Sequence, residues 1–423
     1  MTAMLHVYFD GRYVADLWLE NKSYCFRYRG LDFPAISLTL PVREAPYLHD
    51  EAKSYFANLL PEGEARTSIE MRLGISRGDD YALLQCIGGD CTGAVTVFPH
   101  GVQPSATPTY APLSPAELIQ LVQELPRNPL YIGHGGAVRL SLPGVQHKMA
   151  LYVENGIFHL PENGAPSSHI MKVPITTVPG VAGTVENETF TMTLARMAGL
   201  NVPDVTLQTI GGTPVFLTRR FDRYQDSNGT LRRILQEDLC QLMGLEPTIK
   251  YQNAGGPSLE DCANVIRRYS ADSLADIEQL IRWALFNLVV GNADAHAKNI
   301  AIMQHHGIIR LAPFYDLLST SVYGTNLDSG LAMSIGREYE IEKISRENIS
   351  QCAEFLDVKL RLVQKVGRDL IERITSTAGS TVQMHQESYG EHSVVQAIAD
   401  QAVKRAKALD NLLRPPDSAG IRN

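Results

Sequence analysis

The pattern of apolar and polar residues divides the chain into a front part of short alternating runs and a back part of long helical repeats. The front part begins with LHVYFDGRYVADLWL at 5–19, where Asp10-Gly11 separates two apolar runs. This dipeptide readily takes the positive φ of a tight turn, so we expect a β-hairpin there. A helical patch at 51–74 is interrupted by a Pro-Glu-Gly turn, and GAVTVFP at 93–99 predicts a strand.

A second pattern begins after a proline-rich segment at 101–112, which predicts a linker. LSPAELIQLVQEL predicts a short amphipathic helix with Ser114 as its N-cap. A glycine-rich passage and several strand-like runs follow, and they enclose one buried helix at 188–203. Together these segments describe a small α/β lobe that ends near residue 238.

The remainder of the chain is predicted to be mostly helical. Its best segment is DSLADIEQLIRWALFNLVVGN at 272–292, which begins at Asp272 and ends at Gly291. Apolar residues repeat there at the three-and-four spacing of a core-facing stripe: Ile277, Leu280, Ile281, Ala284, Leu285, Leu288 and Val289. We therefore expect three parts, at residues 1–112, 113–238 and 239–423.

Composition narrows the class of protein. With 423 residues, 44% of them hydrophobic, the chain can bury a large core. The net charge of -8 does not suit a protein that grips nucleic acid by itself, although a basic partner would be tolerated. Six scattered cysteines without CxxC spacing fit neither a disulfide scaffold nor structural zinc. No apolar stretch reaches the ~18 residues of a membrane span, and the start has no signal-peptide pattern, so we expect a cytoplasmic protein.

The polar cluster that follows the long helix carries the candidate chemistry. Asp294 and Asn299 are five positions apart, the spacing of the kinase catalytic loop, in which Asp accepts a hydroxyl proton and Asn holds magnesium. Phosphoryl transfer also needs a second acidic metal ligand, a cation on the phosphates and a covering loop. Asp316, Lys172 and SLPGVQHK at 141–148 supply these parts, in the chain order of a protein kinase.

Each of these residues also has a plainer interpretation. Lys172 could be a solvated residue on an edge strand, and Asp316 could cap a helix that begins at LLST. Asp294 and His296 could be metal ligands of a hydrolase, although no companion motif such as HExxH is present. Glu188 could favour the positive end of its helix, or it could pair with Lys172 as the kinase helix-C glutamate does.

Several segments of this chain resemble the HipA-like serine/threonine kinases, the toxin subunits of bacterial HipBA type II toxin–antitoxin modules. SLPGVQHKMAL, HIMKVP, the NE of VENETF, FLTRRFDR, QEDLCQ, KYQNAGGPS, NADAHAKN and LAPFYD occur in the order of that family. NLLPEGEAR and IGGDCTGAVTVF resemble its N-terminal subdomain, so the resemblance spans nearly the whole chain. It implies an α+β fold with a kinase-like two-lobed architecture, in which ATP lies between a mixed α/β N-terminal part and an all-helical C-terminal part.

The resemblance also implies a role for each matching residue. Asp294 matches the catalytic base, and Asn299 and Asp316 match the Mg²⁺ ligands. Ser141 matches a serine that the family autophosphorylates, which ejects the loop and switches the kinase off. The implied ATP contacts are Pro143, Gly144, Val145, Gln146, His147, Lys148, Lys172, Arg219, Arg220, Phe221 and His296.

Three positions depart from the pattern of the family. Pro143 and His147 stand where better-known members carry a small residue and an acid, and Arg219 stands where an acidic residue is familiar. The segment FYD lacks the glycine of DFG, as is usual in this family. These departures concern the fine detail of nucleotide affinity more than the chemistry.

The implied function is a protein kinase toxin that phosphorylates a component of translation, such as an aminoacyl-tRNA synthetase, with Mg-ATP. Its expected partner is a HipB-like helix-turn-helix antitoxin, through which it would reach operator DNA; no membrane partner is expected. Two alternatives stay open, a small-molecule or lipid kinase and a non-catalytic co-repressor subunit. A co-repressor without catalysis would be expected to lose a metal ligand or the base, and this chain keeps both.

Overall fold

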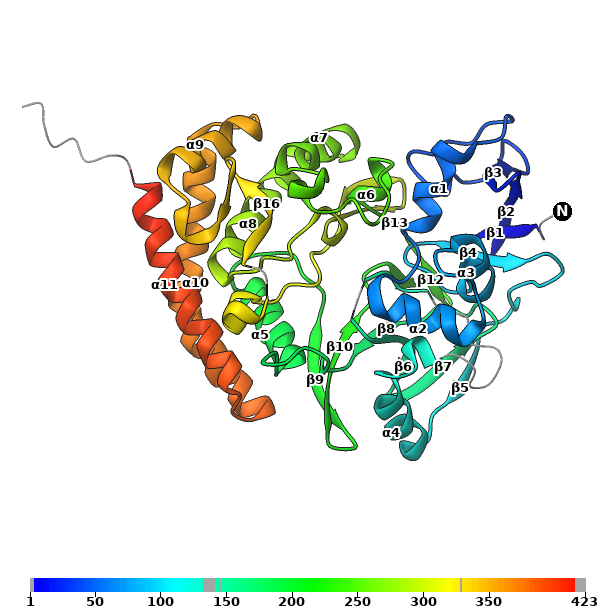
Figure 1. The fold of residues 1–423 in the computed structure, drawn as a ribbon, viewed down its shortest axis with the longest axis horizontal. Coiled ribbons are helices and arrows are strands. Elements are labelled where there is room, and N and C mark those ends of the chain that lie inside the picture. The colour runs from blue at the N-terminus through cyan, green and yellow to red at the C-terminus, as the bar shows by residue number, and fades with distance from the viewer. Residues whose placement is uncertain (1–3, 132–140, 145, 328, 415–423) are drawn as a thin grey trace, which may run out of the picture.

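The computed structural model describes residues 4–131, 141–144, 146–327 and 329–414. Among them, buried apolar side chains form three separate hydrophobic cores, one for the N-terminal sheet, one for the middle sheet and a large one for the helices of the C-terminal part. Figure 1 shows the N-terminal part at one end of the molecule and the paired helices α10 and α11 at the other. In the described ranges, no helix is long and apolar enough to cross a membrane.

The N-terminal part is an antiparallel four-stranded sheet, in the order β3-β2-β1-β4, with three helices. The expected hairpin is present, since Phe9 pairs with Arg12 and both Asp10 and Gly11 have positive φ, at 43° and 83°. The elements are β1 (Leu5–Phe9), β2 (Arg12–Glu20), β3 (Ser23–Tyr28), α1 (His49–Ala57), α2 (Gly63–Leu73), α3 (Asp80–Ile87) and β4 (Val95–Pro99).

The middle part is built on a six-stranded sheet with the order β5-β7-β6-β8-β10-β9. The predicted linker was partly wrong, because Thr109–Pro112 forms strand β5 at the edge of this sheet. An edge strand leaves one side unpaired and therefore tolerates proline. The remaining elements are α4 (Pro115–Glu124), η1 (Pro129–Tyr131), β6 (Lys148–Glu154), β7 (Ile157–Glu162), β8 (His169–Lys172), α5 (Thr184–Met197), β9 (Val205–Ile210), β10 (Thr213–Arg219), β11 (Arg223–Gln225), β12 (Leu231–Arg233) and β13 (Leu235–Asp238).

The C-terminal part is mainly helical, and the expected α+β, two-lobed fold is observed with one correction. The part is not all helical, because β14 pairs with β13 and β15, and β16 pairs with β17. AIMQH and IIRL are too short for stable helices, and they flank His306-Gly307, whose positive φ values (50° and 79°) close a hairpin. The proposed boundaries at residues 112 and 238 stay a prediction.

The elements of this part are α6 (Leu239–Leu242), η2 (Gln252–Ala254), α7 (Leu259–Tyr269), α8 (Ser273–Val290), η3 (Ala297–Asn299), β14 (Ala301–His305), β15 (Ile308–Leu311), η4 (Ser321–Asn326), β16 (Gly330–Ile335), β17 (Glu338–Glu340), η5 (Ile341–Lys343), α9 (Arg346–Phe355), α10 (Leu360–Tyr389) and α11 (Ser393–Leu413). Helix α8 begins at its predicted cap, Asp272, whose side chain accepts from Ala275 N. All seven residues of its predicted stripe are buried, and α8 packs against α7, α10 and α11. The rigid helix fixes the position at which the polar cluster starts.

Candidate active site

The catalytic-loop segment, residues 291–299, directly follows α8. Gly291 ends the helix with φ 70°, and a Cβ at this position would lie 2.0 Å from Ser321 Oγ, so the site requires glycine. Asp294 is the one residue between 291 and 300 that is not buried, and its side chain is 48% exposed. A single carboxylate therefore faces solvent from a segment that is otherwise part of the interior.

Hydrogen bonds within this segment hold Asp294 in place. Its backbone N–H donates to Asn292 Oδ1 at 3.1 Å, and its carbonyl oxygen accepts from His296 N at 3.0 Å. The Asn299 side-chain N–H₂ donates to the same carbonyl at 3.1 Å. Because the amide nitrogen is used in this way, Asn299 Oδ1 is the atom available to a metal ion.

Tyr251 is a site residue that sequence reasoning missed. Its hydroxyl donates to Asp294 Oδ1 at 2.6 Å, across 43 positions of sequence. This bond leaves Asp294 Oδ2 as the carboxylate oxygen that Tyr251 does not hold. Tyr251 lies in the segment KYQNAGGPS, which the family resemblance included, but no local signal points from there to Asp294.

Lys172 lies at the end of β8, between β6 and β10, so it is not a solvated residue on an edge strand. Its ammonium group is 2.6 Å from Glu188 Oε1 and 2.6 Å from Asp316 Oδ1. No helix begins at LLST, and Asp316 is therefore not a helix cap. Glu188 reaches Lys172 from the buried face of α5.

The shared lysine sets the charge state of this trio. Burial would lower the pKa of Lys172, but Asp316 and Glu188 outweigh it and raise this pKa. Burial would raise the pKa of Asp316, but Lys172 and Lys148 hold it well below its usual range. For Glu188 burial dominates and raises the pKa to about 7. A charged lysine and a charged Asp316 are the states that a phosphate cation and a metal ligand need.

The segment that carries Asp316 is tied to the catalytic-loop segment. The Tyr315 hydroxyl donates to the Lys298 carbonyl at 2.5 Å, so the neighbours of Asp316 and Asn299 are in direct contact. Asp316 has φ 60°, a conformation that costs a residue with a Cβ ~1 kcal/mol. Such local strain is found at functional sites, where the surroundings hold it.

The phosphate loop, defined here as residues 141–148, lies beside this trio, and Val145 is outside the described residues. Lys148 stands directly opposite Lys172 across strands β6 and β8, and its ammonium donates to the Pro143 carbonyl at 2.7 Å. Burial, helped by the charge of Lys172, lowers the pKa of Lys148 to about 8. Gly144 has φ 104°, and a Cβ there would lie 2.7 Å from the Lys148 ammonium.

Two histidines of the predicted nucleotide site carry buried ring nitrogens that have no partner in the described part of the chain. These atoms are His147 Nδ1 and His296 Nδ1. Burial lowers the pKa of both rings, so both are neutral near pH 7. A buried polar atom without a partner is costly, which fits a site completed by a polar ligand.

The strand end at Arg219–Phe221 was predicted to lie near the adenine. Arg219 is exposed, and the Phe221 ring stacks on Tyr315 with centroids 5.7 Å apart. The Arg220 guanidinium lies in a buried ion cluster, 2.7 Å from Asp222 and 3.4 Å from Asp90, and these carboxylates balance its charge. A nucleotide contact by this strand end stays a prediction.

Two hypotheses for a metal site were raised above: a hydrolase metal on Asp294 and His296, and Mg²⁺ on Asn299 and Asp316. In the part of the chain that the structure describes, no group of three His, Cys, Asp or Glu side chains is suited to a metal ion. A hydrolase site with Asp294 and His296 as ligands therefore gains no support. Asn299 and Asp316 offer one amide oxygen and one carboxylate, which suits Mg²⁺ because that ion completes its shell with water and phosphate oxygens.

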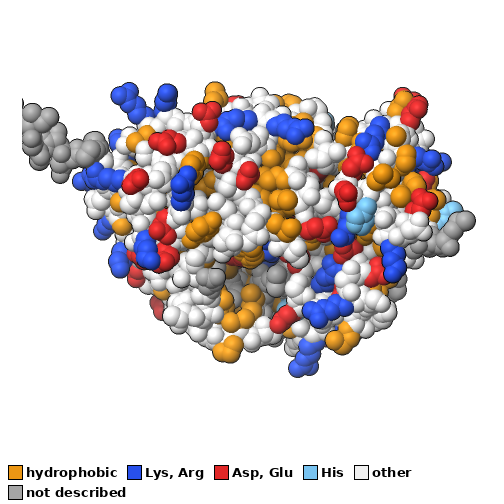
Figure 2. Space-filling view, turned by 45° about the horizontal axis from the view of Figure 1, so that its top comes forward, with side chains coloured by type: hydrophobic (Ala, Val, Ile, Leu, Met, Phe, Trp, Pro, Cys, Tyr) orange, Lys and Arg blue, Asp and Glu red, His pale blue; other side chains and the backbone are white. Residues whose placement is uncertain are grey.

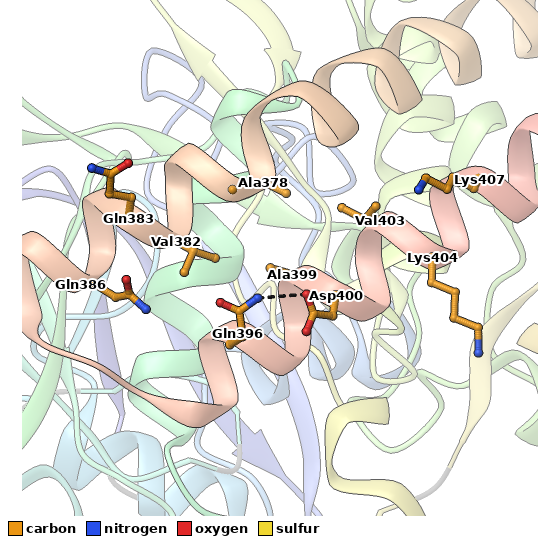
Figure 3. A pocket seen from close by; sticks show the side chains of 11 residues that line it. Ala378, Val382, Gln383, Gln386, Gln396, Ala399, Asp400, Val403, Lys404 and Lys407 are labelled. Carbon is orange, nitrogen blue, oxygen red and sulfur yellow. Dashed lines mark hydrogen bonds between the residues drawn. The ribbon is translucent and has the colours of Figure 1, made fainter.

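The pocket in Figure 3, of about 710 Å³, lies elsewhere, between α10 and α11. Its lining mixes apolar side chains, including Val382 and Val403, with polar ones such as Gln396 and Lys404. None of the predicted site residues lines it. The candidate active site is therefore defined by the charged groups above and not by this pocket.

Comparisons with known proteins agree with this geometry. The family model described as the HipA-like C-terminal domain matches residues 140–383, and the HipA N-terminal domain matches residues 5–98. The chain therefore belongs to the HipA family.

Two similar relatives carry the names of kinases. A Sinorhizobium fredii protein, putative kinase Y4mE, is 36% identical over 417 residues, which is 96% of this chain and 98% of the relative. The serine/threonine-protein kinase toxin HipA of Shewanella oneidensis is 32% identical over 337 residues, 77% of this chain and 75% of the relative. The solved complex of Shewanella oneidensis HipA, HipB and operator DNA contains a chain that matches with TM-score 0.81 and 26% identity, over 96% of this chain and 97% of that one.

Proposed function

We propose that this protein is a serine/threonine-protein kinase that transfers the γ-phosphate of Mg-ATP, and that it is the toxin of a HipBA-type pair. The observation that carries the proposal is the arrangement of Lys172 between Glu188 and Asp316, 2.6 Å from each, beside a buried loop that exposes Asp294. These are the parts of a phosphoryl-transfer site.

The mechanism follows from the orientation of these groups. Asp294 Oδ2 accepts the proton of a serine or threonine hydroxyl while Tyr251 holds Oδ1, and the hydroxyl oxygen attacks the γ-phosphorus. The bond from the γ-phosphorus to the β,γ-bridging oxygen breaks, and ADP leaves with that oxygen. Lys172 neutralises charge on the phosphate oxygens. Asn299 and Asp316 are the residues that would hold Mg²⁺, which supplies further charge neutralisation when bound.

Further roles belong to the same proposal. Pro143, Gly144, Gln146, His147 and Lys148 would cover the phosphates. Phe221 and its neighbours would lie near the adenine, and His296 would contact the nucleotide. Ser141 would be the autophosphorylated residue, and the divisions near residues 112 and 238 would separate an N-terminal subdomain, an ATP-binding lobe and a catalytic part.

The partners are proposed from the relative of known structure, in which HipA is bound to HipB and operator DNA. We propose a HipB-like antitoxin for this chain, with operator DNA contacted mainly through the antitoxin. The net charge of -8 supports this, and Figure 2 shows charges of both signs interspersed over one face. A substrate in the translation machinery, of the aminoacyl-tRNA synthetase type, and a cytoplasmic location complete the proposal.

The test is phosphate transfer from γ-labelled ATP by purified protein shown to be unphosphorylated at the outset. We expect labelled protein with Mg²⁺, no label with a chelator, and a loss of ~10²- to 10⁴-fold in Asp294→Asn. Glu354→Gln, a charge removal at an exposed position of α9, is the matched control and should behave like wild type.

The contrary outcomes point to the two alternatives. ATP turnover without protein labelling would indicate a small-molecule or lipid kinase. Neither turnover nor labelling would indicate a non-catalytic co-repressor.

A further inference from the structure

The segment Asn58–Glu62 of the N-terminal part contacts both loops of the candidate active site. It connects α1 to α2 and contains Pro61 and Glu62 of the Pro-Glu-Gly turn that interrupts the helical patch. Its backbone and its side chains face different partners. We refer to it as the bridging segment.

The backbone of the bridging segment holds the phosphate loop. The Leu59 carbonyl accepts from the Ser141 hydroxyl at 2.6 Å. Pro61 forms a parallel β-bridge with Gly144, and Glu62 N donates to the Gly144 carbonyl at 3.3 Å. These contacts involve main-chain atoms of the bridging segment, so they do not depend on the identity of its side chains.

The side chains of the bridging segment hold the catalytic half of the site. Glu62 Oε2 accepts from the Lys250 ammonium at 2.9 Å, and Oε1 lies 3.5 Å from the Lys298 ammonium. Lys298 also donates to Asn58 Oδ1 and is 3.2 Å from Asp238. The Glu62 side chain is only 14% exposed, so its charge is stable there because the two lysines pair with it.

Each lysine stands next to a residue that shapes the reaction centre. Lys250 directly precedes Tyr251, the hydrogen-bond donor to Asp294. Lys298 directly precedes Asn299, the proposed metal ligand, and its carbonyl accepts from Tyr315, the neighbour of Asp316. One carboxylate from the N-terminal part thus contacts both the segment that carries Tyr251 and the catalytic-loop segment that carries Asp294 and Asn299.

We propose that Glu62 is a positioning residue for phosphoryl transfer. Through Lys250 it fixes Tyr251, which holds Asp294. Through Lys298 it fixes the end of the catalytic-loop segment that carries Asn299. The N-terminal part then contributes a side chain that positions the reacting groups, in addition to its backbone contacts with the phosphate loop. The inference rests on the proposed kinase function, and it predicts that the Glu62 side chain controls the rate of transfer while the backbone of the same residue serves the phosphate loop.

The experiment compares Glu62→Gln with wild type and with the matched control Glu354→Gln in the full chain. The readouts are the single-turnover rate of autophosphorylation, the Kd for a non-hydrolysable ATP analogue and the melting temperature. We expect the rate to fall about 10- to 100-fold, the size of effect that a small misplacement of reacting groups produces. The Kd should change less than about threefold, since the backbone contacts to Gly144 remain.

A double-mutant cycle with Lys250→Met tests the coupling. If Glu62 acts through Lys250, the double variant should be no slower than the slower single variant, because residues that act as a unit are not additive. A loss of rate in the double variant equal to the product of the two single losses would overturn the inference. So would an unchanged rate in Glu62→Gln, or a parallel loss of rate, nucleotide affinity and melting temperature, which would indicate general destabilisation.

The same experiment separates this inference from the proposed function. A wild type that transfers no phosphate overturns the kinase proposal and the role of Glu62 with it. An active wild type with an equally active Glu62→Gln overturns the role of Glu62 alone.

Discussion

The two loops of the candidate site are held in different ways. The catalytic-loop segment is buried except for Asp294, and it is held by its own side chains, Asn292 and Asn299, as well as by the contacts of Lys298 with Asn58 and Glu62. The phosphate loop has the bond from Lys148 to Pro143 within its described residues. It depends on the N-terminal part, because Ser141 bonds to the backbone of Leu59 and of Asp90. A base must stay in place during transfer, whereas a cover must admit and release nucleotide, and the difference in support matches the difference in task.

The two lysines that face one another across β6 and β8 repeat this contrast. Lys172 is shared by two carboxylates, and its pKa is raised after burial is overcome. Lys148 has a neutral carbonyl as its hydrogen-bond partner, and burial lowers its pKa to about 8. Lys172 is therefore a fixed charge, while the charge of Lys148 depends on pH and on what binds beside it.

The largest expected effect is that of removing the fixed charge. Lys172→Met should reduce phosphate transfer by roughly 10³-fold or more, because it removes charge stabilisation at the phosphates and leaves Glu188 and Asp316 without their partner. The loss of transfer rate in Lys148→Met should be at least tenfold smaller than in Lys172→Met. The reason is that Lys148 supports the phosphate loop, whereas Lys172 lies among the charged groups at the reaction centre. Transfer rates of the two variants, measured side by side, check this, and equal losses would contradict the contrast.

The next-largest effects are expected at two glycines. One substitution should mainly lower the stability of the fold, and the other should mainly weaken nucleotide binding. Gly291→Ala should lower the free energy of unfolding by about 2–4 kcal/mol, because it adds left-handed strain and a clash with Ser321. Gly144→Ala also adds backbone strain, because Gly144 has φ 104°, and it should lower the free energy of unfolding by about 1–2 kcal/mol. This loss should be smaller than that of Gly291→Ala, since the new Cβ meets the flexible end of Lys148, and the main effect should be weaker nucleotide binding. Urea unfolding and ATP-analogue titration of both variants test this, and the reverse assignment would show that the phosphate loop is the more rigid element.

The smallest expected effect is a dependence on pH, through Lys148, of the affinity for an ATP analogue and of the stability of the fold. Above pH 8, Lys148 loses its charge, so affinity for an ATP analogue should weaken by up to about tenfold per pH unit, and Lys148→Gln should remove this slope. In the protein without nucleotide, the stability of the fold should change with pH in the opposite direction. The pKa falls from 10.5 to about 8 on folding, so the unfolded chain holds more protons between these values and stability should rise with pH. A flat binding profile across pH 7–9.5 would show that Lys148 does not contact phosphate.

Much of this site could be predicted from sequence because its parts have local signals. Periodicity placed α8 and so fixed the start of the catalytic-loop segment, and the order of Lys172, Asp294, Asn299 and Asp316 indicated a kinase. The missed features are those made by contacts between distant segments.

Three such contacts had no local signal. Tyr251 reaches Asp294 across 43 positions, and Glu62 reaches Lys250 across 188. The Arg220 guanidinium contacts the Asp90 carboxylate across 130 positions. No pattern within one segment encodes such pairs, because they depend on how distant segments pack against each other.

The most direct test of the central claim is a crystal structure of Asp294→Asn with Mg²⁺ and a non-hydrolysable ATP analogue. We expect the metal on Asn299 Oδ1 and the Asp316 carboxylate, a phosphate oxygen within hydrogen-bonding distance of Lys172, and the γ-phosphate facing residue 294. A nucleotide bound away from Lys172 and residue 294, or a metal held by neither Asn299 nor Asp316, would contradict the account.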